Sequence, residues 1–487
     1  MRIGVNLLAF RPDRIGGLEH YVRRLLAALQ ARTPHEFVLF LPRGLDGAFA
    51  EAPERVRLRA FALEDGDAAL ANAMRDETLD LWWCPWVVWR PLRPPVAAVV
   101  TVPDLQHEHL PDSLTPEERL QRRADYLIAA HCAHAVMTFS NHTRDDLRQC
   151  YGVPPDRVFA IPLDVGYDWE SSEPSPELVA DLMARHGTGF LYYPANTWPH
   201  KDHLTLLRAL RRLADQGEPQ RLVLTGAGDH ERGRVERMIQ DQGLSDAVQL
   251  LGTVPPPVVR GLYRLCSAAV FPSRFEGFGM PVLEGMRSRV PVLSSDATSL
   301  PEVGGDAVLY FQAGDVEDLA EKIRRITRDE ALRADLVARG AARAAGFSWT
   351  ETARAVDEVF AFARRSGPPD TAVATALNSV FDRLLGQLAG AEADRDARLA
   401  LIQQQAAQAA DLLELIRQRA AQLESCHADR SARLDVIERM AAGVREALAL
   451  LEPAMPRSYR GLAWPREVKR VRRTIDQSLQ RLRDLLY

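Results

Sequence analysis

Short apolar runs alternate with amphipathic stretches over roughly the first 365 residues of the chain. Many of these runs are apolar at every position, which is typical of parallel strands buried on both faces of a sheet. We expect thirteen strands, at residues 2–10, 36–41, 56–61, 79–84, 97–103, 135–140, 157–163, 190–194, 221–225, 248–252, 268–272, 291–294 and 307–311. Because thirteen strands are too many for one twisted open sheet, the pattern predicts an α/β protein with two doubly wound sheets.

The boundary between the two sheets is expected between residues 166 and 189, where ESSEPSPE (170–177) is a polar stretch with two prolines. We therefore expect two Rossmann-like domains, at 1–165 and 166–346, that face each other across a cleft. A closing helix is expected at 347–367, because SGPPD (366–370) is a strong stop signal. A linker follows at 368–380.

Residues 381–452 carry a heptad pattern in place of strands. Counted from Phe381 as a d position, 17 of the 21 a and d positions as far as Leu451 are apolar, which predicts a coiled coil. ADRDARLALI (393–402) recurs five heptads later as ADRSARLDVI (428–437). The alternative is a helical hairpin folded onto the α/β domains.

Residues 453–487 are expected to form a basic amphipathic tail helix. An apolar stripe runs from Trp464 to Leu486, and residues 457–487 carry nine basic and three acidic side chains. Such a helix lies on an anionic membrane surface or packs against the coil or another subunit. The stripe alone does not distinguish these two interpretations.

Composition and charge exclude several classes of protein. The net charge of −5 argues against a dedicated nucleic-acid binder, and no run reaches the ~20 apolar residues that span a bilayer. The N-terminus lacks a small-residue cleavage site, so it is expected to be a strand rather than a signal peptide. Five widely spaced cysteines without a CxxC give no sign of a disulfide framework or a zinc site and favour the cytoplasm.

Candidate chemistry gathers in residues 271–303, FPSRFEGFGMPVLEGMRSRVPVLSSDATSLPEV. An expected strand runs into a loop with two glycines, and Pro281 suits the first turn of a helix. A glycine loop before a helix offers N–H groups to a phosphate. Glu276 before the loop and Glu284 after it offer carboxylates that accept hydrogen bonds from sugar hydroxyls. The spacing therefore favours a nucleotide sugar as ligand.

The string EGFGMPVLE, followed by PVLSS and LPEVGGDAVLYF, resembles the retaining GT-B-fold glycosyltransferases of family 4. The resemblance covers about residues 1–365 and is most specific between 250 and 350. It implies that Glu276 contacts the donor sugar and that Glu284 binds the ribose hydroxyls. The residues whose backbone or side chains would serve the sugar and diphosphate are Gly277, Phe278, Gly279, Met280 and Pro281.

A second segment, PANTWPHKDHLTLLRAL (194–210), resembles the part of the family where a basic pair neutralises the diphosphate. Lys201 matches the lysine of that pair, and it is one of only three lysines among 61 basic residues. No arginine precedes it, because Asn196, Thr197 or Trp198 stands there. We therefore expect Asn196 and Thr197 to line the donor site and Arg274 to supply the second positive charge.

Two segments of the first domain also match the family. IGG (15–17) resembles the glycine loop that meets the diphosphate, which implies roles for Gly16 and Gly17. VTVPDLQHEHL (100–110) resembles the segment with a His–Asp pair near the donor sugar. Asp104 is present, but a proline replaces the histidine, so His107 becomes the candidate contact for a sugar hydroxyl or a backbone carbonyl. A solvated loop histidine is the alternative.

Three other signals are discounted. Asp65 and Asp67 flank a glycine in a polar loop and predict a turn rather than a metal site. TGAG (225–228) lacks the full dinucleotide fingerprint. His131 and His134 are expected on a helix face, since no third metal ligand is evident.

The sequence thus predicts a metal-independent retaining hexosyltransferase without a cofactor. The segments TWPHK and DLQH are similar to mannosyl- and rhamnosyl-type members that build surface polysaccharides such as O-antigen. We therefore expect GDP-mannose as the first donor and a growing, lipid-linked bacterial glycan as the acceptor. The coil would join a second copy or a partner enzyme, and the tail would hold the protein at the inner face of the plasma membrane. The alternative is an assembly scaffold whose transferase domains bind a donor without turnover.

Overall fold

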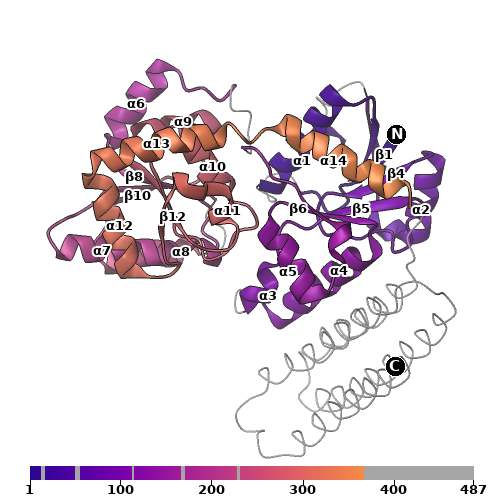
Figure 1. Cartoon of the computed structure of the whole chain (residues 1–487), viewed down its shortest axis with the longest axis horizontal. Coiled ribbons are helices and arrows are strands. Elements are labelled where there is room, and N and C mark those ends of the chain that lie inside the picture. The colour runs from indigo at the N-terminus through magenta and orange to yellow at the C-terminus, as the bar shows by residue number, and fades with distance from the viewer. Residues whose placement is uncertain (12–16, 50–54, 112–113, 166–170, 228–230, 367–487) are drawn as a thin grey trace, which may run out of the picture.

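The computed structural model describes residues 1–11, 17–49, 55–111, 114–165, 171–227 and 231–366. These residues form two α/β domains, which appear as two lobes in Figure 1. The expected α/β class with two doubly wound sheets is confirmed, and all thirteen expected strands form within a few residues of their expected bounds.

Seven parallel strands form the sheet of the first domain, in the order β3-β2-β1-β4-β5-β6-β7. Their bounds are β1 (Arg2–Asn6), β2 (Glu36–Pro42), β3 (Val56–Phe61), β4 (Leu81–Cys84), β5 (Ala97–Thr101), β6 (Ala135–Thr138) and β7 (Val158–Ala160). The central strands β4, β5 and β6 are buried at every position. Burial on both faces explains why these segments are continuous apolar runs.

Two of the helices of the first domain, α4 (Pro116–Cys132) and α5 (Asn141–Tyr151), have clear start signals in the sequence. The bounds of the others are α1 (Gly17–Arg32), α2 (Gly66–Asp76) and α3 (Gln106–His109), with short 3₁₀ turns η1 (Asp46–Phe49), η2 (Leu63–Asp65) and η4 (Pro155–Arg157). Thr115 and Glu118 form a capping box at the start of α4. Ser140 caps α5, which ends at Gly152 in the left-handed conformation.

Six parallel strands form the sheet of the second domain, in the order β10-β9-β8-β11-β12-β13. Their bounds are β8 (Leu191–Pro194), β9 (Leu222–Thr225), β10 (Val248–Leu250), β11 (Ala268–Phe271), β12 (Val292–Ser295) and β13 (Leu309–Phe311). The two inner strands β8 and β11 pair in parallel, so the order of strands reverses between them. This is the place where ligands of open α/β sheets bind, beyond the carboxyl ends of the strands.

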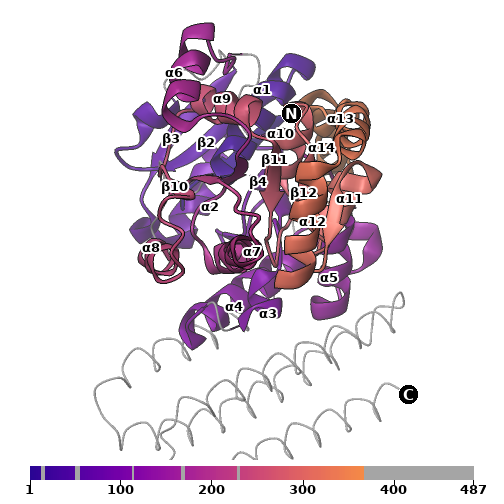
Figure 2. The ribbon, with the colours of Figure 1, turned by 90° about the vertical axis from the view of Figure 1, so that its left-hand side faces the viewer.

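Helices cover both faces of the second sheet (Figures 1 and 2). Their bounds are α6 (Pro176–His186), α7 (His203–Asp215), α8 (Arg232–Asp241), α9 (Pro256–Leu265), α10 (Met280–Arg287), α11 (Leu300–Gly304), α12 (Val316–Arg328) and α13 (Glu330–Ala344), with 3₁₀ turns η5 (Pro199–Lys201) and η6 (Gly305–Ala307). Helices α7 and α12 pack together on one face, and α10 packs against α13 on the other.

The last described helix, α14 (Trp349–Arg364), returns to the first domain and lies beside α1 (Figure 1). Its first residue donates a hydrogen bond from the indole N–H to the carbonyl of Val165, at 3.0 Å. Phe360 packs against Trp83 of the first sheet, with ring centroids 5.6 Å apart. The closing helix expected at 347–367 is therefore the element that completes the first domain. Its N-cap is Ser348.

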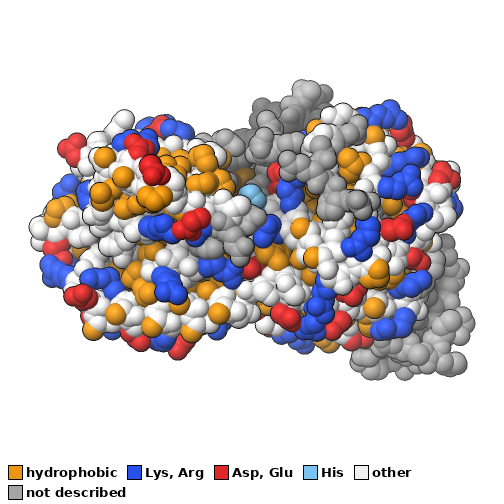
Figure 3. Space-filling view, turned by 90° about the horizontal axis from the view of Figure 1, so that it is seen from above, with side chains coloured by type: hydrophobic (Ala, Val, Ile, Leu, Met, Phe, Trp, Pro, Cys, Tyr) orange, Lys and Arg blue, Asp and Glu red, His pale blue; other side chains and the backbone are white. Residues whose placement is uncertain are grey.

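Several expectations concern residues outside the described ranges. These are the linker at 368–380, the coiled coil at 381–452 and the tail helix at 453–487. Within the described residues, no helix has both the length and the apolar character that a membrane span requires. On the face shown in Figure 3, basic and acidic side chains are interspersed over both lobes.

Candidate functional site

The glycine loop lies between β11 and α10, at the carboxyl end of a central strand of the second sheet. Gly279 immediately precedes α10 and has a φ of +113°, a conformation that side chains disfavour. Two hydroxyls hold the loop in place. The Ser299 hydroxyl donates to the carbonyls of Glu276 and Phe278, both at 2.9 Å, and the Thr298 hydroxyl accepts from the Glu276 N–H at 2.9 Å. The loop backbone is therefore fixed before any ligand arrives.

Lys201 and Glu276 form an ion pair at the centre of this edge. The distance from Lys201 Nζ to Glu276 Oε1 is 2.6 Å, and the two side chains are only 18% and 14% exposed. Burial alone would raise the pKa of Glu276, but Lys201, chiefly through its charge and also through its hydrogen bond, holds that pKa below its ordinary value. Glu276 is therefore an ionised hydrogen-bond acceptor, and Lys201 is a positive charge at the same place.

Local structure fixes the position of Lys201. It ends the η5 turn that follows β8, and its carbonyl accepts a hydrogen bond from the Tyr193 hydroxyl at 2.8 Å. The next residue, Asp202, has a φ of +49° and caps α7 through the Thr205 N–H. The strand, turn and helix thus bring the lysine from one βα connection to the carboxylate of another.

Arg274, the expected second cation, is engaged elsewhere. Its Nε donates to the Asp202 carboxylate at 2.9 Å, and its side chain is 54% exposed. A Cβ at Gly314 would lie 2.8 Å from its guanidinium. The structure thus places Arg274 beside Asp202 and next to the glycine of a neighbouring loop, and it shows no contact between Arg274 and the pair of Lys201 and Glu276.

The other expected residues of the second domain gather around the same edge. Glu284 is buried, one turn into α10, and Phe278 packs against Phe347. Met280 and Pro281 form the half-buried first turn of that helix. The positions from Gly277 to Pro281 thus form the loop and first helical turn that connect Glu276 to Glu284.

Asn196 and Thr197 lie on the segment between β8 and η5. The Asn196 side-chain carbonyl accepts from the Ala227 N–H at 2.7 Å, and the Thr197 N–H donates to the Ala227 carbonyl at 3.0 Å. The Thr197 hydroxyl is buried and has no hydrogen-bond partner among the described residues. A Cβ at Gly226 would lie 2.4 Å from the Ala195 carbonyl. The glycine of the discounted TGAG segment therefore allows the loop after β9 to pass close to the loop after β8.

The loop after β5 brings the first domain against the glycine loop. A Cβ at Gly277 would lie 2.1 Å from the Pro103 carbonyl oxygen and 3.0 Å from Asp104 Cβ. Burial, with a contribution from Glu276, raises the pKa of Asp104 above its ordinary value. The carboxyl ends of β5 and β11 therefore face each other, with Asp104 on the first domain opposite Glu276 on the second.

Sequence reasoning missed two features of this junction, one hydrogen bond and one nearby charge. The Gln106 side-chain amide donates to His200 Nδ1 at 2.7 Å, which joins the two domains. Burial and the charge of Lys201 lower the pKa of His200 to about 4, so its ring stays neutral and accepts this bond. Arg122 on α4 contributes to the electrostatic environment of both Asp104 and His200. Neither feature can be read from a motif, because each depends on tertiary packing.

The structure corrects the expectation for His107. This side chain is completely buried, and its Nε2 lies 2.6 Å from the Tyr151 hydroxyl, which donates to Glu108. Burial, followed by the charges of Arg122 and Arg123, lowers the pKa of His107 to about 3. A neutral ring inside the first domain cannot reach a sugar hydroxyl in this conformation, so His107 is not part of the site.

The remaining expectations have mixed outcomes. Gly17 begins α1 after β1, whereas Gly16 lies outside the described residues. Asp65 and Asp67 were expected in a turn, but Asp65 ends η2 and Asp67 lies in the first turn of α2, where it pairs with Arg90. His131 bonds the Tyr151 carbonyl and His134 accepts from the Ala98 N–H, but His134 lies beyond the end of α4.

A second contact between the domains lies at the start of α5. The Glu302 carboxylate of α11 accepts from the Asn141 N–H at 2.8 Å and from the Asn141 side-chain amide at 2.6 Å. Anions are favoured at a helix N-terminus, because the first N–H groups have no partner within the helix. Glu302 therefore holds the second domain against α5 of the first.

Two facing α/β domains with a lysine–glutamate pair at their junction define a GT-B-type protein. The family model described as "Glycosyltransferase Family 4" matches residues 15–163, and the model described as "Glycosyl transferases group 1" matches residues 176–343. The two matches correspond to the two domains. The chain therefore belongs to the family 4 glycosyltransferases of the GT-B fold.

Curated relatives and solved structures agree with this membership. The chain is 31% identical over 219 residues to O-antigen chain mannosyltransferase B of Escherichia coli, a match that covers 45% of this chain and 58% of the relative. It is 31% identical over 226 residues to the serotype-specific mannosyltransferase WbdA of Escherichia coli, which covers 45% of this chain and 28% of that protein. The matches thus span less than two thirds of the length of these relatives.

The fold is shared with solved structures of low sequence identity. Sucrose-phosphate synthase from Thermosynechococcus elongatus matches with a TM-score of 0.62 and 20% identity, over 74% of this chain and 98% of that one. HepE from Anabaena in complex with UDP and glucose matches with a TM-score of 0.58 and 18% identity, over 74% of this chain and 99% of that one. These likenesses extend over both domains.

Proposed function

We propose that the protein is a retaining glycosyltransferase that moves a sugar from a nucleotide sugar to a hydroxyl of a growing, lipid-linked bacterial surface glycan. The observation that carries the proposal is the partly buried pair of Lys201 and Glu276, 2.6 Å apart at the carboxyl edge of the second sheet. The pair offers a positive charge for a diphosphate and an ionised acceptor for sugar hydroxyls within one site.

The chemistry of the pair changes when a donor enters. An anionic diphosphate attracts Lys201, and the freed Glu276 carboxylate accepts hydrogen bonds from the sugar. In the proposed transfer, the bond between the anomeric carbon and the diphosphate breaks while the acceptor hydroxyl bonds to the same face of the sugar. Its proton passes to a phosphate oxygen of the leaving group. Lys201 stabilises the charge of that leaving group, so no metal is required at this position.

GDP-mannose is the proposed first donor. Two of the relatives carry the names O-antigen chain mannosyltransferase B and serotype-specific mannosyltransferase. These names support a mannosyl donor and a surface-glycan acceptor for this chain. Joining copies through the coil at 381–452 and contacting a membrane through the tail at 453–487 remain part of the proposal.

The test is a panel of nucleotide sugars, read by calorimetric binding and by release of the nucleoside diphosphate in metal-free and Mg²⁺-containing buffer. We expect one donor to bind and to be hydrolysed slowly without metal, and we expect Glu276→Ala to lose both signals. Glu317→Gln on α12 is the control, because Glu317 is an exposed carboxylate. NMR of the product would show whether the anomeric configuration is retained.

Three outcomes would contradict the proposal. If no donor binds, the assignment of the second-domain site is wrong. If a donor binds but neither water nor a lipid-linked glycan fraction consumes it, the protein is a donor-binding assembly scaffold. If the product has the inverted configuration, the retaining mechanism is wrong.

A further inference from the structure

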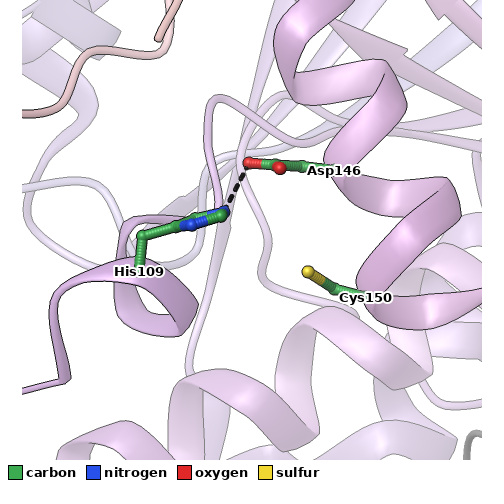
Figure 4. Close-up of side chains that lie close together, drawn as sticks. All are labelled: His109, Asp146 and Cys150. Atoms are coloured by element: carbon green, nitrogen blue, oxygen red, sulfur yellow. Dashed lines mark hydrogen bonds and ion pairs between the residues drawn. The ribbon is translucent and has the colours of Figure 1, made fainter. Parts of the chain in front are cut away.

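Three side chains that commonly bind metals converge on the first domain, outside the site described above. His109 belongs to α3, and Asp146 and Cys150 lie four residues apart on α5. Residues four apart share one face of a helix. A nitrogen of the histidine, an oxygen of the aspartate and the sulfur of the cysteine all lie within 4.8 Å of one another. Figure 4 shows the three side chains directed toward a common space.

The donor atoms match the chemistry of a borderline-soft divalent ion. Imidazole nitrogen, carboxylate oxygen and thiolate sulfur are the three ligand types that Zn²⁺ takes in proteins. Around a tetrahedral zinc such ligands lie roughly 3.3–3.7 Å apart, as follows from bond lengths of about 2.0–2.3 Å. His109 Nε2 and Asp146 Oδ2 are 2.8 Å apart. An ion would therefore be accommodated by side-chain shifts of about 1 Å.

A fourth residue supports the cluster from the preceding turn of α5. His142 Nε2 lies 3.5 Å from the same Asp146 oxygen, and this buried nitrogen has no hydrogen-bond partner among the described residues. Asp146 is only 7% exposed, and its ion pairs in the described part of the chain are with these two imidazoles. A buried carboxylate thus faces two rings that carry charge only when protonated. His142 is placed to donate to the carboxylate and orient it, as outer partners of metal ligands do.

We propose that His109, Asp146 and Cys150 bind one divalent transition-metal ion of the Zn²⁺ type, with water completing its coordination. Binding requires a neutral imidazole and a thiolate, so the ion displaces the proton shared by His109 and Asp146 and the thiol proton. The three ligands are far apart in the sequence, and only one of them is a cysteine, so no CxxC motif marks the site. This inference does not depend on the proposed transferase activity.

The location gives the ion a structural role at the junction of the domains. The His109 ring stacks on Phe275 of the second domain, with centroids 5.3 Å apart and an interplanar angle of 28°. Phe275 directly precedes Glu276. An ion that fixes the His109 ring therefore fixes the surface on which Phe275 rests, without contact to Lys201 or Glu276.

Cobalt provides the test, because Co²⁺ substitutes for Zn²⁺ and a thiolate ligand gives it a near-ultraviolet charge-transfer band. The untagged full-length protein is stripped of metal, titrated with Co²⁺ and then with Zn²⁺. We expect one equivalent of Co²⁺ to produce the band and Zn²⁺ to abolish it. Cys150→Ser should lose the band, and Cys266→Ser, a half-buried thiol of the second domain, should keep it. His142→Gln should weaken Co²⁺ binding about 10-fold or more.

The circular dichroism spectrum of each variant shows whether that variant is folded. The proposal is overturned if the wild type shows no stoichiometric band, if Cys150→Ser retains the band, or if folded Asp146→Asn binds Co²⁺ as tightly as the wild type. Full affinity in folded His142→Gln would remove His142 from the site.

Discussion

Lys201 and Glu276 determine the charge of the candidate donor site. The glutamate is largely withdrawn from water, and the lysine keeps it ionised. Both residues were predicted from the sequence, because the loop motif and the rarity of lysine mark them. Their direct contact was not predicted, since it joins two βα connections that lie 75 residues apart.

Replacing Lys201 by alanine should affect both stability and binding. Glu276 would remain buried without its partner, so its pKa should rise, and the free energy of unfolding should fall by about 1–3 kcal/mol after allowance for partial exposure. Donor affinity should fall about 10-fold or more through loss of a charge-assisted bond. Urea unfolding and calorimetry measure the two effects. Unchanged donor affinity in a folded variant would exclude Lys201 from the donor site.

Buried histidines make the protein sensitive to acid. Burial, followed by the charge of Lys201, lowers the pKa of His203 to about 4, and this side chain is 3% exposed. Below pH 6.5 His203 is protonated in the unfolded chain but remains neutral in the folded chain until the pH reaches about 4. The free energy of unfolding therefore falls as the pH drops from about 6.5 to 4. For His203 alone the loss at pH 5 is about 2 kcal/mol. The raised pKa of Asp104 opposes this trend.

Denaturant unfolding at pH 7 and pH 5 checks this prediction. His203→Gln should reduce the difference in unfolding free energy between the two pH values, and His186→Gln, at the end of α6, should not. An equal pH dependence in wild type and His203→Gln would show that His203 is not responsible.

Among the elements, the strands and the glycine loop could be predicted well, and the contacts between domains could not. Most strands are local apolar runs, and the pattern of apolar positions detects such runs directly. His107 shows the limit. Its position near a known motif suggested the cleft, but the packing of α4 and α5 encloses it against Tyr151. Burial of that kind depends on tertiary contacts that no local pattern encodes.

The glycine loop can approach the first domain closely because residue 277 has no side chain. The close atoms that a Cβ would meet there belong to Pro103 and Asp104 of the other domain. Gly277→Ala should therefore leave the second domain folded and able to bind donor, while it lowers the rate of transfer about 10-fold or more by keeping the domains apart. Binding and turnover are compared with Gly233→Ala on α8, where the nearest flexible atom is 3.5 Å away. Wild-type turnover in Gly277→Ala would contradict this role.

At the scale of the whole molecule, several contacts among the described residues join the two domains. Glu302 on α11 meets the start of α5, Gln106 meets His200, and His109 meets Phe275. All three lie on the side where the strands end. Two polar contacts and one aromatic stack therefore join the domains around the site.

Removing the Glu302 carboxylate should shift the molecule toward an open arrangement. Glu302→Ala loses bonds to a helix N-terminus that are worth about 1–3 kcal/mol, and small-angle scattering should show a larger radius of gyration in the absence of donor. Glu321→Ala on α12 is the matched control, because this exposed carboxylate lies away from the junction. An unchanged radius of gyration would show that Glu302 does not control closure.

The return of α14 to the first domain has a consequence for synthesis. The first domain lacks this helix until the ribosome has made the entire second domain, since Trp349 follows α13 in the chain. At about 5–20 residues per second, roughly 10–40 s separate the end of β7 from the end of α14. During that interval Trp83 and the groove beside α1 have no cover from Phe360 and its neighbours. The domain that begins first is thus the one that matures last, and a nascent chain arrested before residue 349 should depend on chaperones for its solubility.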